Sequence, residues 1–249
     1  MAVLVISKTP HGDPEDVERA PAASATPAAT PIRQDPLPAL LAEAKTWPVV
    51  LAENFDSATT PTDLSRNFNS EPDSDDTCTR AAGVNSSLDV LNLTATPKAK
   101  VNCLVVVPIG PARATTGFCL QVEVQLWPAV AKAGLIFLVR EPAAKNFYAF
   151  MISKRGYSLA VYKQGAWNPL RLTQATSAIH PARFNSLAVV AVGTDLTLFI
   201  NDQKVDQLSN VPLSAGRVGV AMDTDGLEPA TFDFDNFELR SKSAMPKSH

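Results

Sequence analysis

Residues 133–165, AGLIFLVREPAAKNFYAFMISKRGYSLAVYKQG, give the clearest indication of how this 249-residue chain folds. They contain three runs with strand composition, at 135–140, 146–153 and 157–163. The sequences Glu-Pro-Ala-Ala-Lys and Lys-Arg-Gly separate these runs and are typical of turns. Because such connections are too short for crossover helices, the three strands must run antiparallel.

Strand-like runs continue on both sides of this stretch, with turns between them and almost no helix. They lie at residues 47–56, 87–94, 101–107, 118–127, 186–192, 195–201, 217–222 and 231–239. Roughly eleven short strands are typical of an all-β sandwich or barrel. Residues 103–108 and 187–192 are apolar on both faces, which predicts central strands covered on both sides, or strands covered by a long loop.

The composition fits a globular β domain. Hydrophobic residues make up 45% of the chain and charged residues 19%, which is enough apolar material for a well-filled core. The net charge is -3 and no basic run is present, so nucleic acid is not expected as a partner. No glycine-rich phosphate-binding motif is present, so no nucleotide cofactor is expected.

The chain is predicted to have three parts. Residues 1–45 form a Pro/Ala/Thr-rich disordered linker, although residues 40–45 could make one or two helical turns. Residues 46–240 form a monomeric β-sandwich domain, and residues 241–249 form a frayed tail. The apolar residues 1–6 are too short to span a bilayer, and one hypothesis makes them the remnant of a membrane anchor that tethers the protein.

The three cysteines, Cys78, Cys103 and Cys119, lack the spacing of a zinc site. One disulfide and one free thiol are an option, with Cys78 and Cys103 the favoured pair because both lie in or beside short strands early in the domain. Three reduced, half-buried thiols are the alternative, and the sequence leaves both open.

Several motifs of the chain belong together in a known kind of domain. They are Gly134-x-Ile136-Phe137, Asn146-Phe147-Tyr148-x-Phe150, Gly156-Tyr157, Gly165-x-Trp167, Leu196-x-Leu198-Phe199-x-Asn201-Asp202, Gly216-x-Val218-Gly219 and Phe234-Asp235-Asn236-Phe237. With these motifs, about residues 47–240 resemble the concanavalin A-like jelly-roll domains of bacterial surface and secreted proteins, of the 3-keto-disaccharide hydrolase-like and laminin G-like superfamily. The resemblance implies the fold and, because that family combines sugar-binding modules, glycosidases and domains without a ligand, leaves the function open.

The closing strand has a break in its alternation. Phe232 and Phe234 have one parity and Phe237 and Leu239 the other, and a bulge at Asp235-Asn236 would bring all four to the core.

The same bulge would place Asp233, Asp235 and Glu238 together on the opposite face. This D-x-D-x-x-E spacing resembles the catalytic strand of laminarinase-type glycosidases, in which two carboxylates flank the scissile bond. It departs from that pattern at Asp233, where the family has Glu, and at the polar Asn236. We therefore expect no catalytic residues and interpret these carboxylates as a solvated or cation-binding outer face. A structural calcium ion near Asp56 and Asp235, where the first and last strands should meet, is left open.

Aromatic residues near the central hairpins indicate a ligand site. The candidate ligand-binding residues are Trp167, Tyr162, Tyr148, Arg140 and Glu123. Sugar rings stack their C–H faces on aromatic rings, and Arg140, Glu123 and Gln125 could bond to the hydroxyls. In the run 118–127, Gln121, Glu123, Gln125 and Trp127 share a polar face with Cys119. The alternative is that these aromatic side chains serve core and rim packing.

The sequence thus favours a non-catalytic carbohydrate-binding or surface-recognition module that works outside the cytoplasm, on a glycan or another cell-surface ligand. A glycoside hydrolase acting on a disaccharide or polysaccharide is one alternative. A structural or protein-interaction sandwich without a small ligand is the other.

Overall fold

The structure is a computed structural model, and it describes residues 38–56, 78–98, 102–114, 117–126, 131–139, 146–163, 166–213, 215–224 and 228–242. The chain divides into two units, Met1–Asp35 and Pro36–His249, and all described residues belong to the second. The predictions for residues 1–37, for Arg140 and Trp127 and for most of the C-terminal tail fall outside the described residues.

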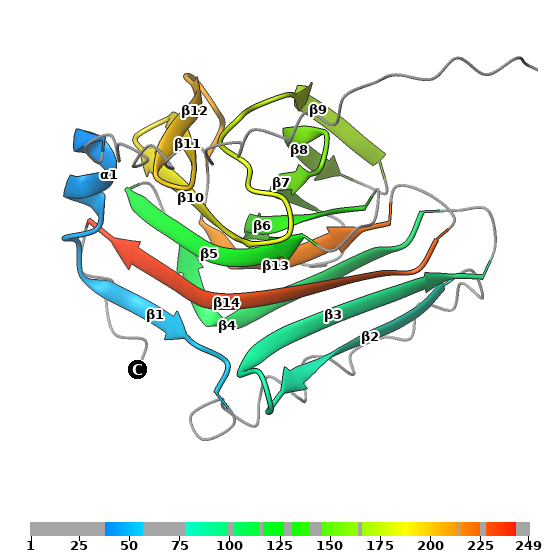
Figure 1. The fold of residues 1–249 in the computed structure, drawn as a ribbon. Helices are drawn as coiled ribbons and strands as arrows, with labels where there is room; N and C mark the ends of the chain where they lie inside the picture. The colour runs from blue at the N-terminus through cyan, green and yellow to red at the C-terminus, as the bar shows by residue number, and fades with distance from the viewer. Residues whose placement is uncertain are drawn as a thin grey trace, which may run out of the picture. The chain divides into compact units, whose positions relative to one another are not determined.

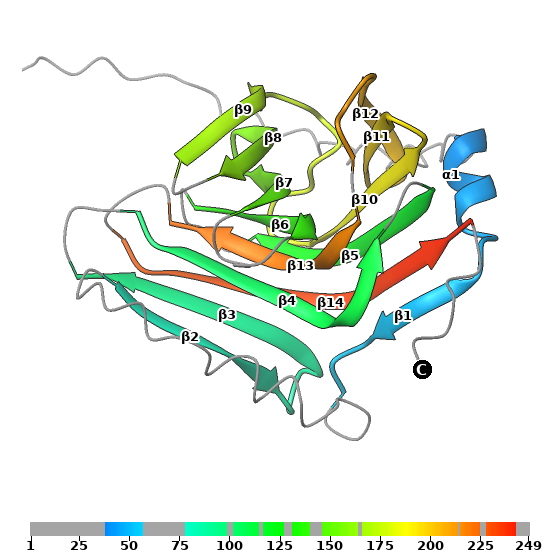
Figure 2. The ribbon, with the colours of Figure 1, turned by 180° about the vertical axis from the view of Figure 1, so that it is seen from behind.

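Two antiparallel sheets form the domain, and Figures 1 and 2 show them from opposite sides. Sheet A has the order β12-β11-β10-β5-β14-β3-β2, and β1 also pairs with β14. Its strands are β1 (Val49–Glu53), β2 (Cys78–Asn85), β3 (Val90–Pro97), β5 (Phe118–Leu126), β10 (Phe184–Val192), β11 (Asp195–Ile200), β12 (Gln203–Leu208) and β14 (Ala230–Ser241). The predicted meeting of the first and last strands is confirmed.

Sheet B has the order β4-β13-β6-β7-β8-β9. Its strands are β4 (Leu104–Ala114), β6 (Lys132–Val139), β7 (Asn146–Ser153), β8 (Gly156–Lys163), β9 (Ala166–Gln174) and β13 (Gly216–Asp223). The three consecutive antiparallel strands predicted from residues 133–165 are β6, β7 and β8. Gly134 and Gly219 lie where a Cβ would meet the Phe150 and Val107 carbonyl oxygens, so these strands need glycine for close backbone approach.

Three strands were missed in the sequence, and all three are edge strands. β2 and β12 end sheet A, and β9 ends sheet B. Their sequences are rich in small or polar residues, and β9 contains Pro169, features that edge positions tolerate. For residues 103–108 the central position is wrong, because β4 is the other end strand of sheet B, and the alternative of a covering loop stays a prediction. For residues 187–192 the central position is confirmed, since β10 pairs on both sides.

The main core fills the space between the sheets, and the closing strand contributes to it through the predicted bulge. The β14–β5 register shifts between Asp235 and Glu238, and Asn236 has φ 49°. As a result, all four expected side chains are buried: Phe232, Phe234, Phe237 and Leu239. The carboxylates between them face away from the core.

Helix α1 (Ala39–Ala44) lies across the outer face of sheet A, so the folded part begins before residue 46. Leu41, Ala44 and Trp47 recur at about one-turn spacing and are buried against sheet A residues. The sheet residues in this cluster are Cys119, Ala188, Val190 and Phe199. The predicted helical turns are confirmed, and packing explains why so short a helix is stable.

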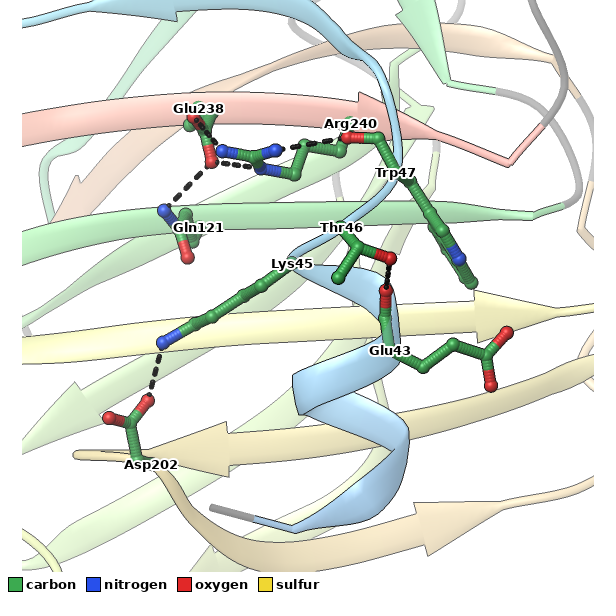
Figure 3. A network of polar contacts seen from close by, with 8 residues as sticks. All are labelled: Glu43, Lys45, Thr46, Trp47, Gln121, Asp202, Glu238 and Arg240. Atoms are coloured by element: carbon green, nitrogen blue, oxygen red, sulfur yellow. Dashed lines mark hydrogen bonds and ion pairs between the residues drawn. The ribbon is translucent and has the colours of Figure 1, made fainter.

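Polar contacts hold α1 in place, as Figure 3 shows. Lys45 Nζ lies 2.9 Å from Asp202 Oδ1. Arg240 donates to the Trp47 carbonyl oxygen at 3.0 Å and binds Glu238 through two hydrogen bonds, of 2.6 and 2.9 Å. Glu238 also accepts a 3.0 Å bond from Gln121, so this carboxylate belongs to the anchorage of α1.

Cys78 and Cys103 form a disulfide, which decides between the two alternatives that the sequence left open. It joins the start of β2 in sheet A to the residue before β4 in sheet B. Cys119 is a free, buried thiol beneath α1. Desolvation, followed by the charge of Glu238, raises the pKa of Cys119 to about 12, so this thiol is unreactive in the folded protein.

Candidate functional site

The structure distributes the predicted ligand-binding residues over the two outer faces and the core. Tyr162 on β8 and Trp167 on β9 are cross-strand partners on the outer face of sheet B. Tyr148 on β7 has the opposite parity and packs against the main core. Glu123 on β5 lies on the outer face of sheet A, where it bonds to Asn236. The four described residues therefore do not form one site, which corrects their grouping.

Tyr162 and Trp167 meet in an aromatic cluster with Phe147. The ring centroids of Tyr162 and Trp167 are 4.9 Å apart at an angle of 63°, and those of Phe147 and Tyr162 are 5.1 Å apart and nearly parallel. The Phe147 ring meets Trp167 edge-on at 5.9 Å. Phe147 is buried, whereas Tyr162 and Trp167 are partly exposed. A buried ring thus supports two rings that a ligand can reach.

The surroundings of the aromatic cluster are apolar. Ile136, Ala149, Met151 and Ala221 are buried on the same face, and Leu104 and Val106 are partly buried there. Because the side chains of the alanines and Gly134 are small, this part of the face projects less from the sheet than the neighbouring rings do. The buried residues therefore pack beneath the rings, and Tyr162 and Trp167, bordered by the partly exposed Leu104 and Val106, are the side chains that a flat, C–H-rich ligand can contact.

Tyr148 has a structural position. Its ring stacks on Phe137 with centroids 5.5 Å apart, and its hydroxyl donates to the Pro212 carbonyl oxygen at 3.0 Å. This bond links β7 to the loop before β13. The parity of β7 explains the difference from Phe147, because successive side chains of a strand point to opposite faces.

The outer face of sheet A carries carboxylates in three different settings. Asp233 is 5% exposed and accepts a 2.7 Å bond from Asn92. Glu238 is held by Arg240. Asp235 lies directly across the β14–β5 pair from Glu123, and the side-chain nitrogen of Asn236 bridges both carboxylates, at 3.1 Å from Glu123 and 3.3 Å from Asp235.

The pKa of Asp235 is raised above its ordinary value. Desolvation is the largest cause, and the negative charges of Glu123 and Asp89 add to it, while a bond from the Asn236 backbone N–H opposes it. Two facing carboxylates, one with a raised pKa, are the elements of general acid catalysis. The D-x-D-x-x-E spacing predicted this face, whereas Glu123 as the partner of Asp235 follows from register alone.

Among the described residues no group of three or more His, Cys, Asp or Glu side chains could hold a metal ion. Asp56 is not among the charges that affect Asp235, so the calcium site near these two residues stays a prediction. Within the same residues, no helix has the length and apolar character needed to cross a membrane.

A network that sequence reasoning missed fixes the loop before β10. Asn185 is fully buried, accepts from the His180 backbone N–H at 2.7 Å and donates to the His180 carbonyl oxygen at 2.9 Å. Asn201, at φ 49°, donates to Asn185 at 2.9 Å and to the Ala178 carbonyl oxygen at 2.7 Å. The Asn201-Asp202 motif is therefore a structural element of the fold.

No protein-family model and no curated protein matches this sequence. Solved structures do match. The GlcNAcα1-4Gal-releasing endo-β-galactosidase of Clostridium perfringens has a TM-score of 0.54 at 10% identity, over 83% of this chain and 64% of that one. A Bacillus subtilis protein of unknown function with a galectin-like fold has a TM-score of 0.51 at 8% identity, over 78% and 96% of the chains.

The Bacillus licheniformis β-glucanase has a TM-score of 0.50 at 10% identity, over 78% of this chain and 98% of that one. Identities this low show the fold alone, and the finer assignment to the 3-keto-disaccharide hydrolase-like superfamily stays a prediction. The predicted fold is confirmed: this chain folds as an antiparallel two-sheet sandwich of the jelly-roll, concanavalin A-like type.

Proposed function

We propose that this domain is a non-catalytic carbohydrate-binding module that works outside the cytoplasm. The observation that carries the proposal is the pair of partly exposed rings, Tyr162 and Trp167, supported from below by Phe147. Rigid aromatic side chains supply contact area at low entropic cost, and their faces accept the C–H faces of sugar rings. The apolar border of the cluster favours contact through these C–H faces over contact through hydroxyls.

The position of the carboxylates supports binding without cleavage. Asp233, Asp235 and Glu238 lie on sheet A, while the aromatic cluster lies on sheet B, across the core. A glycosidase needs its acid and its second carboxylate on either side of the bound glycosidic bond. A glycan stacked on Tyr162 and Trp167 is beyond the reach of this carboxylate strand. Two structural neighbours, a β-glucanase and an endo-β-galactosidase, are by name enzymes that act on glycans, which supports glycan as the ligand class.

A glycan array probed with the full chain tests the proposal. Trp167→Ala and Tyr162→Ala should each weaken glycan retention at least tenfold, because each removes a ring face. Leu172→Ala is the matched control, since Leu172 lies on the same strand and is 70% exposed. Unchanged retention in Trp167→Ala would remove the aromatic cluster from the site.

The second candidate is a glycoside hydrolase that uses Asp235 and Glu123. The facing pair and the raised pKa of Asp235 favour it. A reducing-sugar assay beside the array separates the two functions, since a hydrolase would release sugar and lose that activity in Asp235→Asn. If the protein neither binds a glycan on the array nor releases reducing sugar, the structural or protein-interaction function would remain.

The disulfide supports the proposed location, because disulfides persist in oxidising compartments. Fractionation of the native protein, with non-reducing electrophoresis of each fraction, is the test. We expect the oxidised protein in the extracellular or surface fraction. Reduced protein confined to the cytosol would contradict this part of the proposal.

A further inference from the structure

The hairpin that joins β2 to β3 has an exposed turn. Ser86, Ser87, Leu88 and Asp89 are all exposed, and Leu88 shows 62% of its surface to solvent. The turn begins at Asn85 with the sequence Asn85-Ser86-Ser87. An asparagine followed two residues later by serine, with a residue other than proline between them, is the acceptor pattern for N-linked glycosylation.

The turn holds Asn85 in a defined conformation. Its side-chain oxygen accepts two bonds from Ser87, one from the backbone N–H at 3.2 Å and one from the hydroxyl at 2.7 Å. The Leu88 N–H donates to the Asn85 carbonyl oxygen at 3.1 Å, which closes the turn. Among the described residues, none accepts a hydrogen bond from Asn85 Nδ2. The amide oxygen is thus engaged by the serine that the pattern requires, while the amide nitrogen is available.

We propose that Asn85 is the acceptor of an N-linked glycan. The donor is a lipid-linked oligosaccharide pyrophosphate. A transferase of the secretory route catalyses transfer of the oligosaccharide from this donor to Asn85. A bond forms between Asn85 Nδ2 and the anomeric carbon of the donor, and the bond from that carbon to the pyrophosphate oxygen breaks. The lipid pyrophosphate leaves with the bonding electron pair, and the nitrogen loses one proton to water. The hydroxyl of Ser87 draws electron density toward the amide oxygen, which favours that loss. The inference rests on the extracellular location in the proposed function.

The surface beside Asn85 has room for a sugar. A shallow open hollow is lined by Ala81, Ala82, Gly83, Val84, Asn85 and Asn92. Its floor has small side chains, and it follows β2, the terminal strand of sheet A. A glycan here would lie over the open strand edge and the exposed Leu88, and both are surfaces that otherwise favour association between copies.

The same β-hairpin contains a matched control, because Asn92-Leu93-Thr94 also fits the acceptor pattern. Asn92 lies in the middle of β3, with Asp233 and Gly83 as its cross-strand partners. Its Nδ2 donates to Asp233 Oδ1 at 2.7 Å, and Thr94 donates to its Oδ1 at 3.1 Å. A glycan on Asn92 would remove this donor from a buried carboxylate. We therefore expect Asn92 to be unmodified.

Mass spectrometry of the native protein from its own cells tests this directly. Trypsin should release residues 81–98 as one peptide that contains both asparagines. An amidase that removes N-linked glycans converts the modified asparagine to aspartate, and fragmentation then locates it. We expect conversion at Asn85 and none at Asn92. In full-length variants, Asn85→Gln and Ser87→Ala should abolish the glycan-dependent mobility shift, whereas Ser87→Thr and Thr94→Ala should keep it.

Secreted protein with unmodified Asn85 would overturn the inference, and so would a mobility shift that persists in Asn85→Gln or a glycan found on Asn92. The proposed function fails separately. Glycan-array binding by Asn85→Gln would show that the aromatic cluster works whether or not Asn85 is modified. Protein confined to the cytosol would overturn both the proposed location and this inference.

Discussion

The outer faces of the two sheets differ, although both cover the same core. On sheet A, α1 covers an apolar patch, and the remainder presents Glu123, Asp233 and Asp235 with amide side chains. On sheet B, the outer face is apolar and carries the aromatic cluster. Strands with polar outward residues face solvent, whereas strands apolar on both sides require a second apolar layer. The difference separates a face suited to acid chemistry from one suited to stacking.

The largest change in stability is expected at Phe147 on the outer face of sheet B, and it is compared with Glu123 on the outer face of sheet A. Phe147→Ala should lower the free energy of unfolding by about 3–5 kcal/mol, because it leaves a cavity under Tyr162 and Trp167 at a site that is 2% exposed. Glu123→Gln should change it by no more than about 0.5 kcal/mol. Urea unfolding followed by circular dichroism measures both. Equal effects would show that the outer face of sheet B is not a packed layer.

The next effect concerns the covalent link between the sheets. Replacing Cys78 and Cys103 with alanine opens the loop that the disulfide closes between two cysteines 25 residues apart in the sequence. The free energy of unfolding should fall by about 3 kcal/mol, since the unfolded chain gains conformational entropy. Wild-type protein unfolded in a reducing agent is the matched control and should lose the same amount. Unchanged stability in both would mean that the link does not restrict the unfolded chain.

The smallest expected effect concerns Asp235 and its dependence on pH. Because the pKa of Asp235 is raised in the folded state, the folded protein binds this proton more tightly than the unfolded chain does. The stabilisation is complete below the ordinary aspartate pKa of about 3.9 and is lost as the pH rises through the folded pKa. At pH 7, Asp235→Asn should therefore be more stable than the wild type, by less than about 1 kcal/mol because solvent screens this partly exposed group.

Unfolding curves measured between about pH 3 and pH 7 test this expectation. Glu123→Gln is the control, because removing its charge should shift the wild-type profile toward that of an ordinary aspartate. Lower stability of Asp235→Asn at pH 7 would contradict the argument and would indicate that the hydrogen bonds to Asn236 outweigh desolvation.

Local alternation made much of the fold predictable. The three central strands and the bulge at Asp235-Asn236 follow from the spacing of apolar residues and turn signals, and the structure confirms them. Edge strands were missed because only one side of each is paired, so their sequences need not show a strong pattern. The end position of β4 was missed for a related reason, since its apolar outward residues, Leu104 and Val106, indicated a central strand.

The class of fold, the polar face of β5 and the aromatic character of the central hairpins can be predicted from the sequence, because alternation and turn chemistry are local. Which of these side chains meet depends on how the strands pair. Register placed Trp167 beside Tyr162 and Glu123 opposite Asp235, and strand parity turned Tyr148 into the core. Pairing in a sheet joins residues that are distant in the chain, and a shift of one residue exchanges the two faces, so composition alone cannot fix a site.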